Sequence, residues 1–146
     1  HIESKAALLK DICFDVAKAF TTQMDSVENS NINQIEKVES IIRFYIQMML
    51  KRFEEVYVSN HEWKYLQEPH LAGFLHQRKN YERRFTAVIK KGIEKKEFKQ
   101  IHPYVAVLTI LSAVRGIEFW YRSKHNIGVT EMENDLVTIL INGIKK

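Results

Sequence analysis

The sequence predicts an all-α protein, a bundle of about six helices. Only five glycines and two prolines interrupt its 146 residues. Between these interruptions, apolar residues recur every three or four positions, which is the spacing of one face of an α-helix. No segment alternates between apolar and polar residues as a half-buried strand does. Because 45% of the residues are hydrophobic and 27% are charged, as in ordinary globular domains, we expect one domain over residues 1–146.

The first two helices are predicted from their apolar stripes and start signals. The first should begin at Ser4, because a serine hydroxyl can accept from a free backbone N–H at a helix start. Its stripe runs from Leu8 to Met24 and ends at the polar sequence SVENSN. The second helix should begin near Asn31. Either it continues past Phe53, or it gives way there to a bend or a separate short helix.

Two prolines mark further helix starts. Proline suits the first helical turn, because its missing N–H leaves no hydrogen bond unmade there. A long amphipathic helix is predicted from Pro69 to about Lys96, and another begins at Pro103. The last helix is predicted to open with a capping box, in which the side chains of Thr130 and Glu133 satisfy each other's backbone donors.

Several kinds of chemical site are not indicated by the sequence. The single cysteine, Cys13, excludes an internal disulfide and a paired-cysteine zinc site, and its apolar neighbours predict a buried structural thiol. The histidines are scattered, and there is no HExxH, no GxSxG and no glycine-rich phosphate loop. We therefore expect no catalytic residues, no metal and no cofactor, and a protein that is not an enzyme.

Charge and hydropathy bound the location and the partners. The net charge of +4 permits contact with nucleic acid or anionic ligands without demonstrating it. The first residues lack the basic start and apolar centre of a signal peptide. No apolar run approaches the ~18 residues that a membrane-spanning helix needs. We expect a cytoplasmic protein without a membrane partner.

The segment Tyr104–Tyr121 is apolar on more sides than a helix at a monomer surface needs. One of its strips consists of small residues, which allow helix backbones to approach closely. The last helix has a similar surplus. A central helix buried in a monomer would show the same pattern, but we favour a symmetric four-helix interface with a second copy of the chain. The residues predicted for this homodimer interface are Thr109, Ala113, Gly116, Trp120, Leu136 and Leu140.

Two arginines, Arg78 and Arg115, interrupt apolar stripes. A buried guanidinium must be paired, or it is costly. Glu118 lies three residues beyond Arg115 and is the obvious partner for a structural ion pair. The alternative is that these charges recognise an anionic ligand. The neighbouring aromatic and methionine side chains could belong to the core or to an adaptable pocket. The predicted ligand-binding residues are Tyr45, Met49, Arg78, Phe85, Arg115 and Phe119.

Three stretches resemble the TetR family of bacterial transcriptional regulators. The opening HIESKAALLKDI resembles the junction between the recognition helix and the long linking helix. Arg78–Phe98 is similar to the family's penultimate core helix, although Lys96 or Glu97 stands where a second glycine is usual. Phe119–Ile144, which begins FWYRSK, resembles the last two helices of the acyl-CoA-responsive branch.

This resemblance implies the effector-binding and dimerisation portion of a ligand-responsive regulator, expected to be a repressor. The implied effector is a small apolar or acyl-CoA-like molecule. The family also implies an N-terminal helix-turn-helix that binds operator DNA; residues 1–4 would be its remnant, so this stretch alone should not read operator sequence. Ser4 and Lys5 would approach a DNA phosphate. The rival hypotheses are a helical lipid-binding protein or enzyme, and an interaction module without a ligand.

Overall fold

The computed structural model describes residues 2–123 and 126–146, which form seven α-helices and no strand. The predicted all-α fold is therefore confirmed over these residues. The helices are α1 (Ile2–Glu28), α2 (Gln34–Lys51), α3 (Phe53–His61), α4 (His70–Glu94), α5 (Pro103–Arg115), α6 (Ile117–Ser123) and α7 (Val129–Ile144), and the short 3-10 helix η1 (Trp63–Tyr65) follows α3.

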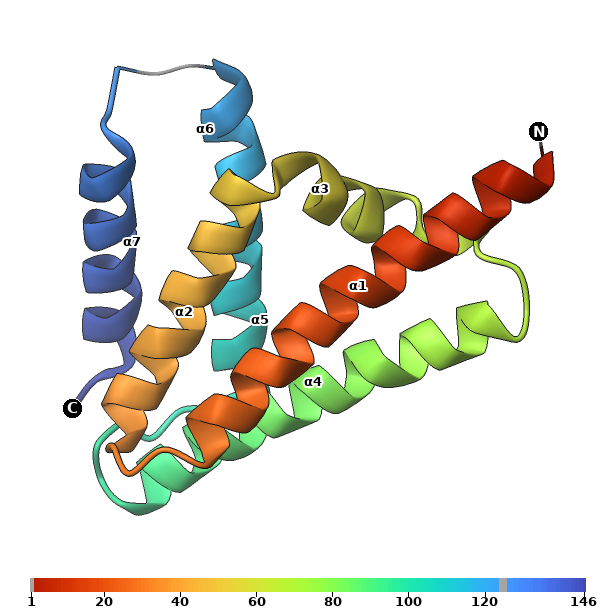
Figure 1. Cartoon of the computed structure of the whole chain (residues 1–146). Coiled ribbons are helices and arrows are strands. Elements are labelled where there is room, and N and C mark those ends of the chain that lie inside the picture. Colours follow the sequence, from red (N-terminus) through yellow and green to blue (C-terminus); the bar gives the residue numbers. More distant parts are fainter. Residues whose placement is uncertain (1, 124–125) are drawn as a thin grey trace.

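The two long helices, α1 and α4, lie side by side, while α2, α5 and α7 stand roughly upright next to them (Figure 1). The main core lies around α2, which contacts each of the other six α-helices. A smaller cluster of Cys13, Leu66 and Phe74 packs α1 and α4 against the segment that follows η1. Cys13 is buried, as predicted, and burial raises the pKa of its thiol to about 11, so it is protonated at neutral pH.

Helix α1 extends beyond both predicted ends. Ser4 lies within the helix rather than capping it, and the predicted polar loop begins only after Glu28. Two contacts explain the longer helix. Val27 is buried in the core, and Arg84 of α4 forms salt bridges with Asp25 and Glu28. Tertiary packing therefore outweighs the polar composition of this segment.

Two residues from different parts of the chain cap the start of α2. The side chain of Asn33 accepts from the backbone N–H of Glu36 at 2.8 Å. The carboxylate of Glu97, far along the sequence, accepts from the backbone N–H of Gln34 at 2.9 Å. At its other end α2 stops at Lys51, so the open question about Phe53 is resolved in favour of a separate short helix, α3.

The turn after α4 packs tightly against the helix that it leaves. Lys96 adopts a φ of 61°, a left-handed conformation that glycine tolerates better than other residues. The turn brings the ring of Phe98 so close to Gly92 that a Cβ at position 92 would lie 2.2 Å from a ring carbon. Gly92 is thus required by this close approach.

Helix α7 begins without the predicted capping box. Gly128 is its N-cap, and no side chain forms a capping hydrogen bond. The carboxylate of Glu133 is instead drawn to α2, where it accepts from Arg43 at 2.8 Å. The expectation for Thr130 and Glu133 was wrong, because an ion pair between helices took the carboxylate that the local motif needed.

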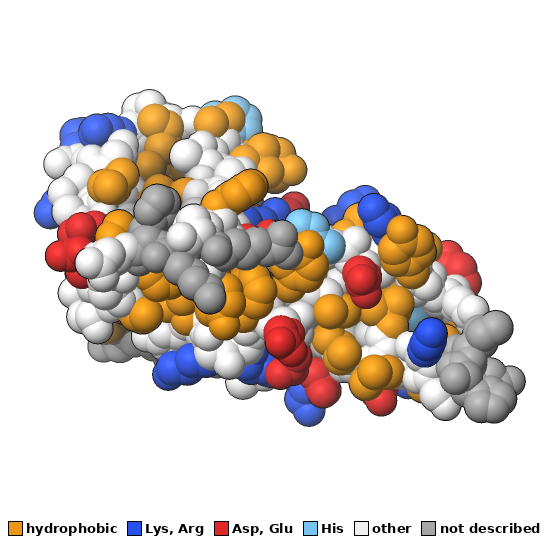
Figure 2. Space-filling model, turned by 90° about the horizontal axis from the view of Figure 1, so that it is seen from above, with side chains coloured by type: hydrophobic (Ala, Val, Ile, Leu, Met, Phe, Trp, Pro, Cys, Tyr) orange, Lys and Arg blue, Asp and Glu red, His pale blue; other side chains and the backbone are white. Residues whose placement is uncertain are grey.

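A single residue, Gly116, separates α5 from α6. By length and composition the stretch Pro103–Tyr121 would suffice to cross a membrane, contrary to the sequence-based expectation, but the core helices of globular proteins pass the same test. Only 33% of its most apolar part is buried within the chain. Hydrophobic side chains gather at the α6–α7 end of the molecule, in the left half of Figure 2. The surplus of apolar surface predicted for this helix is therefore present.

Candidate ligand-binding site

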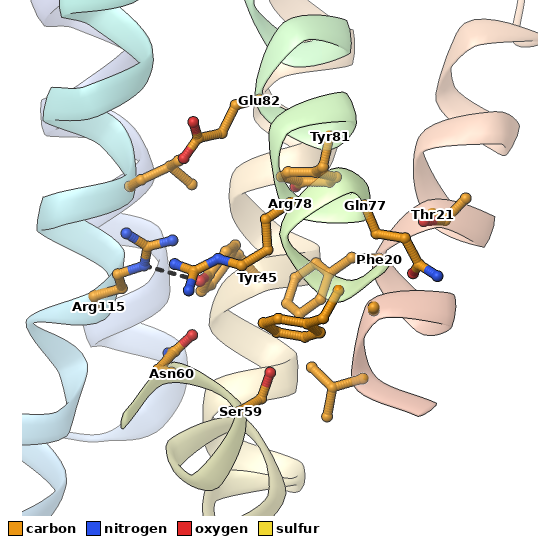
Figure 3. A pocket seen from close by; sticks show the side chains of 14 residues that line it. Phe20, Thr21, Tyr45, Ser59, Asn60, Gln77, Arg78, Tyr81, Glu82 and Arg115 are labelled. Atoms are coloured by element: carbon orange, nitrogen blue, oxygen red, sulfur yellow. Dashed lines mark hydrogen bonds between the residues drawn. The ribbon is translucent and has the colours of Figure 1, made fainter. Parts of the chain in front are cut away.

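A cavity of about 60 Å³ lies where α1, α2, α3, α4 and α5 converge. Its apolar walls come from α1, α4 and α5, and include Val16, Phe20, Phe74 and Leu111. Polar side chains converge on it from five helices (Figure 3). The polar residues that line the cavity are Thr21, Tyr45, Ser59, Asn60, Gln77, Arg78, Tyr81, Glu82 and Arg115.

Tyr45 holds Arg115 in place at the cavity. Nε of Arg115 donates a hydrogen bond to the Tyr45 hydroxyl oxygen at 3.1 Å. The Tyr45 ring is itself buried, with its centroid 4.6 Å from that of Phe20. Burial alone would lower the pKa of Arg115, but the Tyr45 oxygen and the nearby Glu82 carboxylate more than offset it, so the pKa lies above its ordinary value.

Arg78 occupies a less favourable place. Burial lowers the pKa of Arg78, and the adjacent positive charge of Arg115 lowers it further. Its guanidinium lies over the rings of Trp63 and Phe74, with carbon-to-centroid distances of 5.5 and 5.8 Å. These rings attract a cation electrostatically, but less strongly than a carboxylate would. Figure 3 shows the head groups of the two arginines next to each other, close to Tyr45.

The cavity carries a net positive charge. Among the described residues, the salt bridges involve Arg43, Arg52, Arg84 and His61, and none of them reaches Arg78 or Arg115. Glu82 is the one acidic residue on the cavity wall, against two arginines. The site therefore has one positive charge more than its own side chains neutralise, which favours an anion.

Two further donors in the cavity lack partners. The hydroxyl of Tyr81 and the side-chain nitrogen of Asn60 are both shielded from solvent, and neither has a hydrogen-bond partner within the described part of the chain. Burial raises the pKa of Tyr81 far above its ordinary value, so the hydroxyl keeps its proton and remains a donor. A buried donor without a partner is costly unless something in the cavity accepts from it.

The predicted ligand-binding residues fall into two groups. Tyr45, Arg78 and Arg115 all line the cavity. Met49 and Phe85 lie in the main core, and neither is among the residues that line the cavity. Phe119 is 79% exposed on α6 and does not line the cavity.

The proposed partnership of Arg115 with Glu118 does not form. The carboxylate of Glu118 contacts Nε2 of His61, at 2.9 Å for the closer oxygen. Glu118 thus ties α6 to α3, while Arg115 donates to Tyr45 at the cavity.

Sequence reasoning missed six of the polar residues at the cavity, which are Thr21, Ser59, Asn60, Gln77, Tyr81 and Glu82. Ser59 and Asn60 lie on α3, a helix of nine residues that is too short for a clear periodic signal. Glu82 lies one position after Tyr81 on α4 and looks like an ordinary surface acid in the sequence. Neither a motif nor a spacing marks these residues, since they meet only where several helices converge on the cavity.

The residues predicted for the dimer interface lie on or beside the apolar face of α5–α7. Thr109 is exposed, whereas Leu140 is buried within the chain. Ala113, Trp120 and Leu136 are half-buried and pack against the core. The side chains that leave most apolar surface uncovered on these three helices are Tyr104, Val105, Leu108, Phe119, Tyr121, Val129 and Ile139.

Ser4 and Lys5, predicted to meet a DNA phosphate, are exposed near the start of α1. This end of α1 projects beyond the rest of the bundle, far from the C-terminus (Figure 1). Both side chains are thus free to contact a partner, and their role in contacting DNA stays a prediction.

The sequence profile of the tetracyclin repressor-like C-terminal domain matches residues 31–144. The chain belongs to this family, TetR. Its members are transcriptional regulators rather than enzymes. No curated protein sequence is significantly similar to the chain.

Crystal structures of TetR-family regulators share the fold. A tetR-family regulatory protein from Rhodococcus RHA1 is 18% identical with a TM-score of 0.82, over 97% of this chain and 74% of that protein. AibR in complex with isovaleryl coenzyme A and operator DNA is 20% identical with a TM-score of 0.83, over 97% and 77%. The ketosteroid transcriptional regulator KstR2 of Mycobacterium tuberculosis is 15% identical with a TM-score of 0.85, over 96% and 72%.

Proposed function

We propose that this TetR-family chain is the effector-binding and dimerisation domain, over residues 1–146, of a ligand-responsive repressor. The effector would be a small apolar or acyl-CoA-like molecule with an anionic group, held in the cavity between α1 and α5. One observation carries the proposal: two half-buried arginines face a cavity that also has apolar walls, and no carboxylate in the described part of the chain forms a salt bridge with either. AibR, whose structure contains isovaleryl coenzyme A, gives a precedent for such an effector on this fold.

The position of the cavity suggests how a ligand would act. Val16 and Phe20 of α1 form part of its wall, so a molecule that enters must contact α1 directly. A ligand can shift an equilibrium only if it binds two arrangements of the protein with different affinity. We infer that occupancy favours a different tilt of α1, and that this tilt moves the end of the helix that carries Ser4 and Lys5.

The proposed DNA-binding role belongs to the same end of α1. Residues 1–4 would form the end of a helix-turn-helix unit that reads operator DNA, with Ser4 and Lys5 near a phosphate. Two such units would be held at a fixed spacing by a homodimer formed through α5, α6 and α7. Such a repressor would act in the cytoplasm, where its operator is.

A calorimetric titration tests the effector proposal. Acyl-CoAs, free fatty acids and uncharged aromatic compounds are titrated into the wild-type chain and into Arg115→Met. The proposal expects anionic ligands to bind and the substitution to abolish their binding selectively. Equal affinity in both proteins, together with a lower thermal stability of Arg115→Met, would show that Arg115 has a structural role only. If no class of ligand binds, the interaction-module hypothesis gains.

A further inference from the structure

We propose that the cavity binds a free short-chain monocarboxylate of about two to four carbons, with its carboxylate between Arg78 and Arg115. This inference rests on the proposed function, since it names the chemical class of the effector for the same cavity. Three independent properties of the cavity support it: the kind of hydrogen-bonding groups on its wall, its net charge and its size.

The polar wall offers donors in excess of acceptors. Nε of Arg115 donates to the Tyr45 hydroxyl. Its two terminal nitrogens form no hydrogen bond with any described residue, so their N–H groups remain available. The Tyr81 hydroxyl and the Asn60 nitrogen are buried donors without partners. Arg78 contributes a fork of N–H groups that contacts aromatic rings but no carboxylate. A carboxylate has two oxygens with about four acceptor sites and no donor, so it complements this set, whereas an amide or an alcohol would add donors of its own.

The charge of the site selects a monoanion. Two arginines and one glutamate on the wall give the site a net charge of about one positive unit. One carboxylate neutralises it in a region where burial makes an uncompensated charge costly. A dicarboxylate would bring a second negative charge into the same small space, close to Glu82.

The size of the cavity sets the length of the ligand. A buried water needs about 10–15 Å³ of such volume, so a cavity of about 60 Å³ accommodates roughly four to six non-hydrogen atoms. The carboxylate uses three of these atoms. The remainder form a short alkyl group, which would lie against Phe20, Phe74 and Leu111 on the apolar wall. A coenzyme A group or a long acyl chain would have to extend out of this space.

Thermal unfolding of the full chain with and without ligand tests the inference. Sodium butyrate is compared with sodium chloride at equal ionic strength, with the neutral isostere butyramide, and with butyryl-CoA. We expect a saturable rise in melting temperature with butyrate and none with butyramide. A calorimetric titration then measures the dissociation constant of each compound. We expect measurable binding for butyrate and none for butyramide or butyryl-CoA.

Matched arginine variants locate the binding. Arg115→Gln and Arg78→Gln should each weaken butyrate binding by about tenfold or more, the usual effect of losing a hydrogen bond to a charged group. Arg84→Gln is the control, because Arg84 pairs with Asp25 and Glu28 outside the cavity. Its affinity for butyrate should stay within about twofold of wild type. Ala17→Leu adds bulk at the cavity wall without changing charge, and it should also weaken binding if the ligand lies there.

The outcomes separate this inference from the proposed function. If butyramide binds as well as butyrate, or if Arg84→Gln loses as much affinity as the cavity variants, the carboxylate site is wrong. Binding of butyryl-CoA without butyrate would overturn the inference and leave the proposed effector function standing. If neither these compounds nor the wider set of acyl-CoAs, fatty acids and aromatics binds to a wild-type chain with native circular dichroism, both fall together.

Discussion

Nε of Arg115 donates a hydrogen bond to the hydroxyl oxygen of Tyr45 at 3.1 Å, joining two residues 70 positions apart in the sequence. The bond directs the rest of the guanidinium into the cavity beside Arg78, as Figure 3 shows. It replaces the ion pair with Glu118 that the sequence suggests.

Tyr45→Phe should lower the free energy of unfolding by about 1–2 kcal/mol, because Arg115 would lose its hydrogen-bond acceptor while remaining largely buried. The ring packing against Phe20 is retained, so the change isolates the hydroxyl. Urea denaturation measures the effect. Tyr65→Phe is the control, because Tyr65 is 70% exposed and should show a change below about 0.5 kcal/mol. Equal stability of Tyr45→Phe and wild type would mean that the hydrogen bond contributes nothing.

Arg78→Met should raise the melting temperature of the unliganded chain. The substitution removes a half-buried positive charge that adjoins Arg115 and has no salt bridge, and it introduces an apolar side chain of similar length. Replacing poorly compensated buried charge with a packed apolar side chain typically stabilises by about 1 kcal/mol or more. Arginine stays protonated at all accessible pH values, so the gain should persist from acid to alkaline buffer. A clear drop in melting temperature would mark Arg78 as a structural residue.

Lys96→Gly should stabilise the chain by about 0.5–1 kcal/mol. Lys96 has a φ of 61°, and a left-handed conformation costs a residue with a Cβ roughly 1–2 kcal/mol. Glycine avoids that strain, although its greater freedom in the unfolded chain takes back part of the gain. Chemical denaturation of the variant checks the sign. The matched control is Lys95→Gly, one residue earlier at a negative φ of −83°, which should destabilise instead. Stabilisation by both substitutions would contradict this account of the turn.

Gly92→Ala should destabilise the chain by about 1–3 kcal/mol, the typical cost of overpacking a core. Alanine would favour the helix by about 1 kcal/mol, but its Cβ would lie 2.2 Å from the Phe98 ring, so the ring must move out of the core. The steric effect therefore prevails. The double variant Gly92→Ala with Phe98→Ala should show less than the sum of the two single losses, as measured by a double-mutant cycle. Strict additivity would mean that the two positions do not interact.

Ile139→Glu should convert a homodimer into a monomer. Ile139 is 68% exposed on α7, so a glutamate there is tolerated in the monomer but would be a buried, unpaired charge in the predicted interface. Sedimentation at micromolar concentration measures the mass. Leu8→Glu serves as the control, since Leu8 is 60% exposed on α1, away from α5–α7, and should leave the mass unchanged. If the wild-type chain already sediments as a monomer, the predicted interface is wrong.

The sequence by itself determined the helical class and much of the helix layout. The apolar spacing, Pro69 and Pro103 placed α4 and α5, because helix periodicity and proline stereochemistry act over a few neighbouring residues. The same local signals marked the apolar surplus of α5–α7. Arg78 and Arg115 stood out in the sequence because each interrupts an apolar stripe, and both line the cavity.

Only the tertiary structure decided which groups meet. Phe119 is exposed on α6 and Glu118 pairs with His61 of α3, while the position of α3 beside the cavity brings Asn60 to the same wall as the arginines. Lys96 takes a left-handed conformation because the turn that follows α4 must place Phe98 against Gly92. These choices depend on rotations between helices and on contacts between residues far apart in the chain. Periodicity and spacing describe one helix at a time, so they cannot specify partners that another helix supplies.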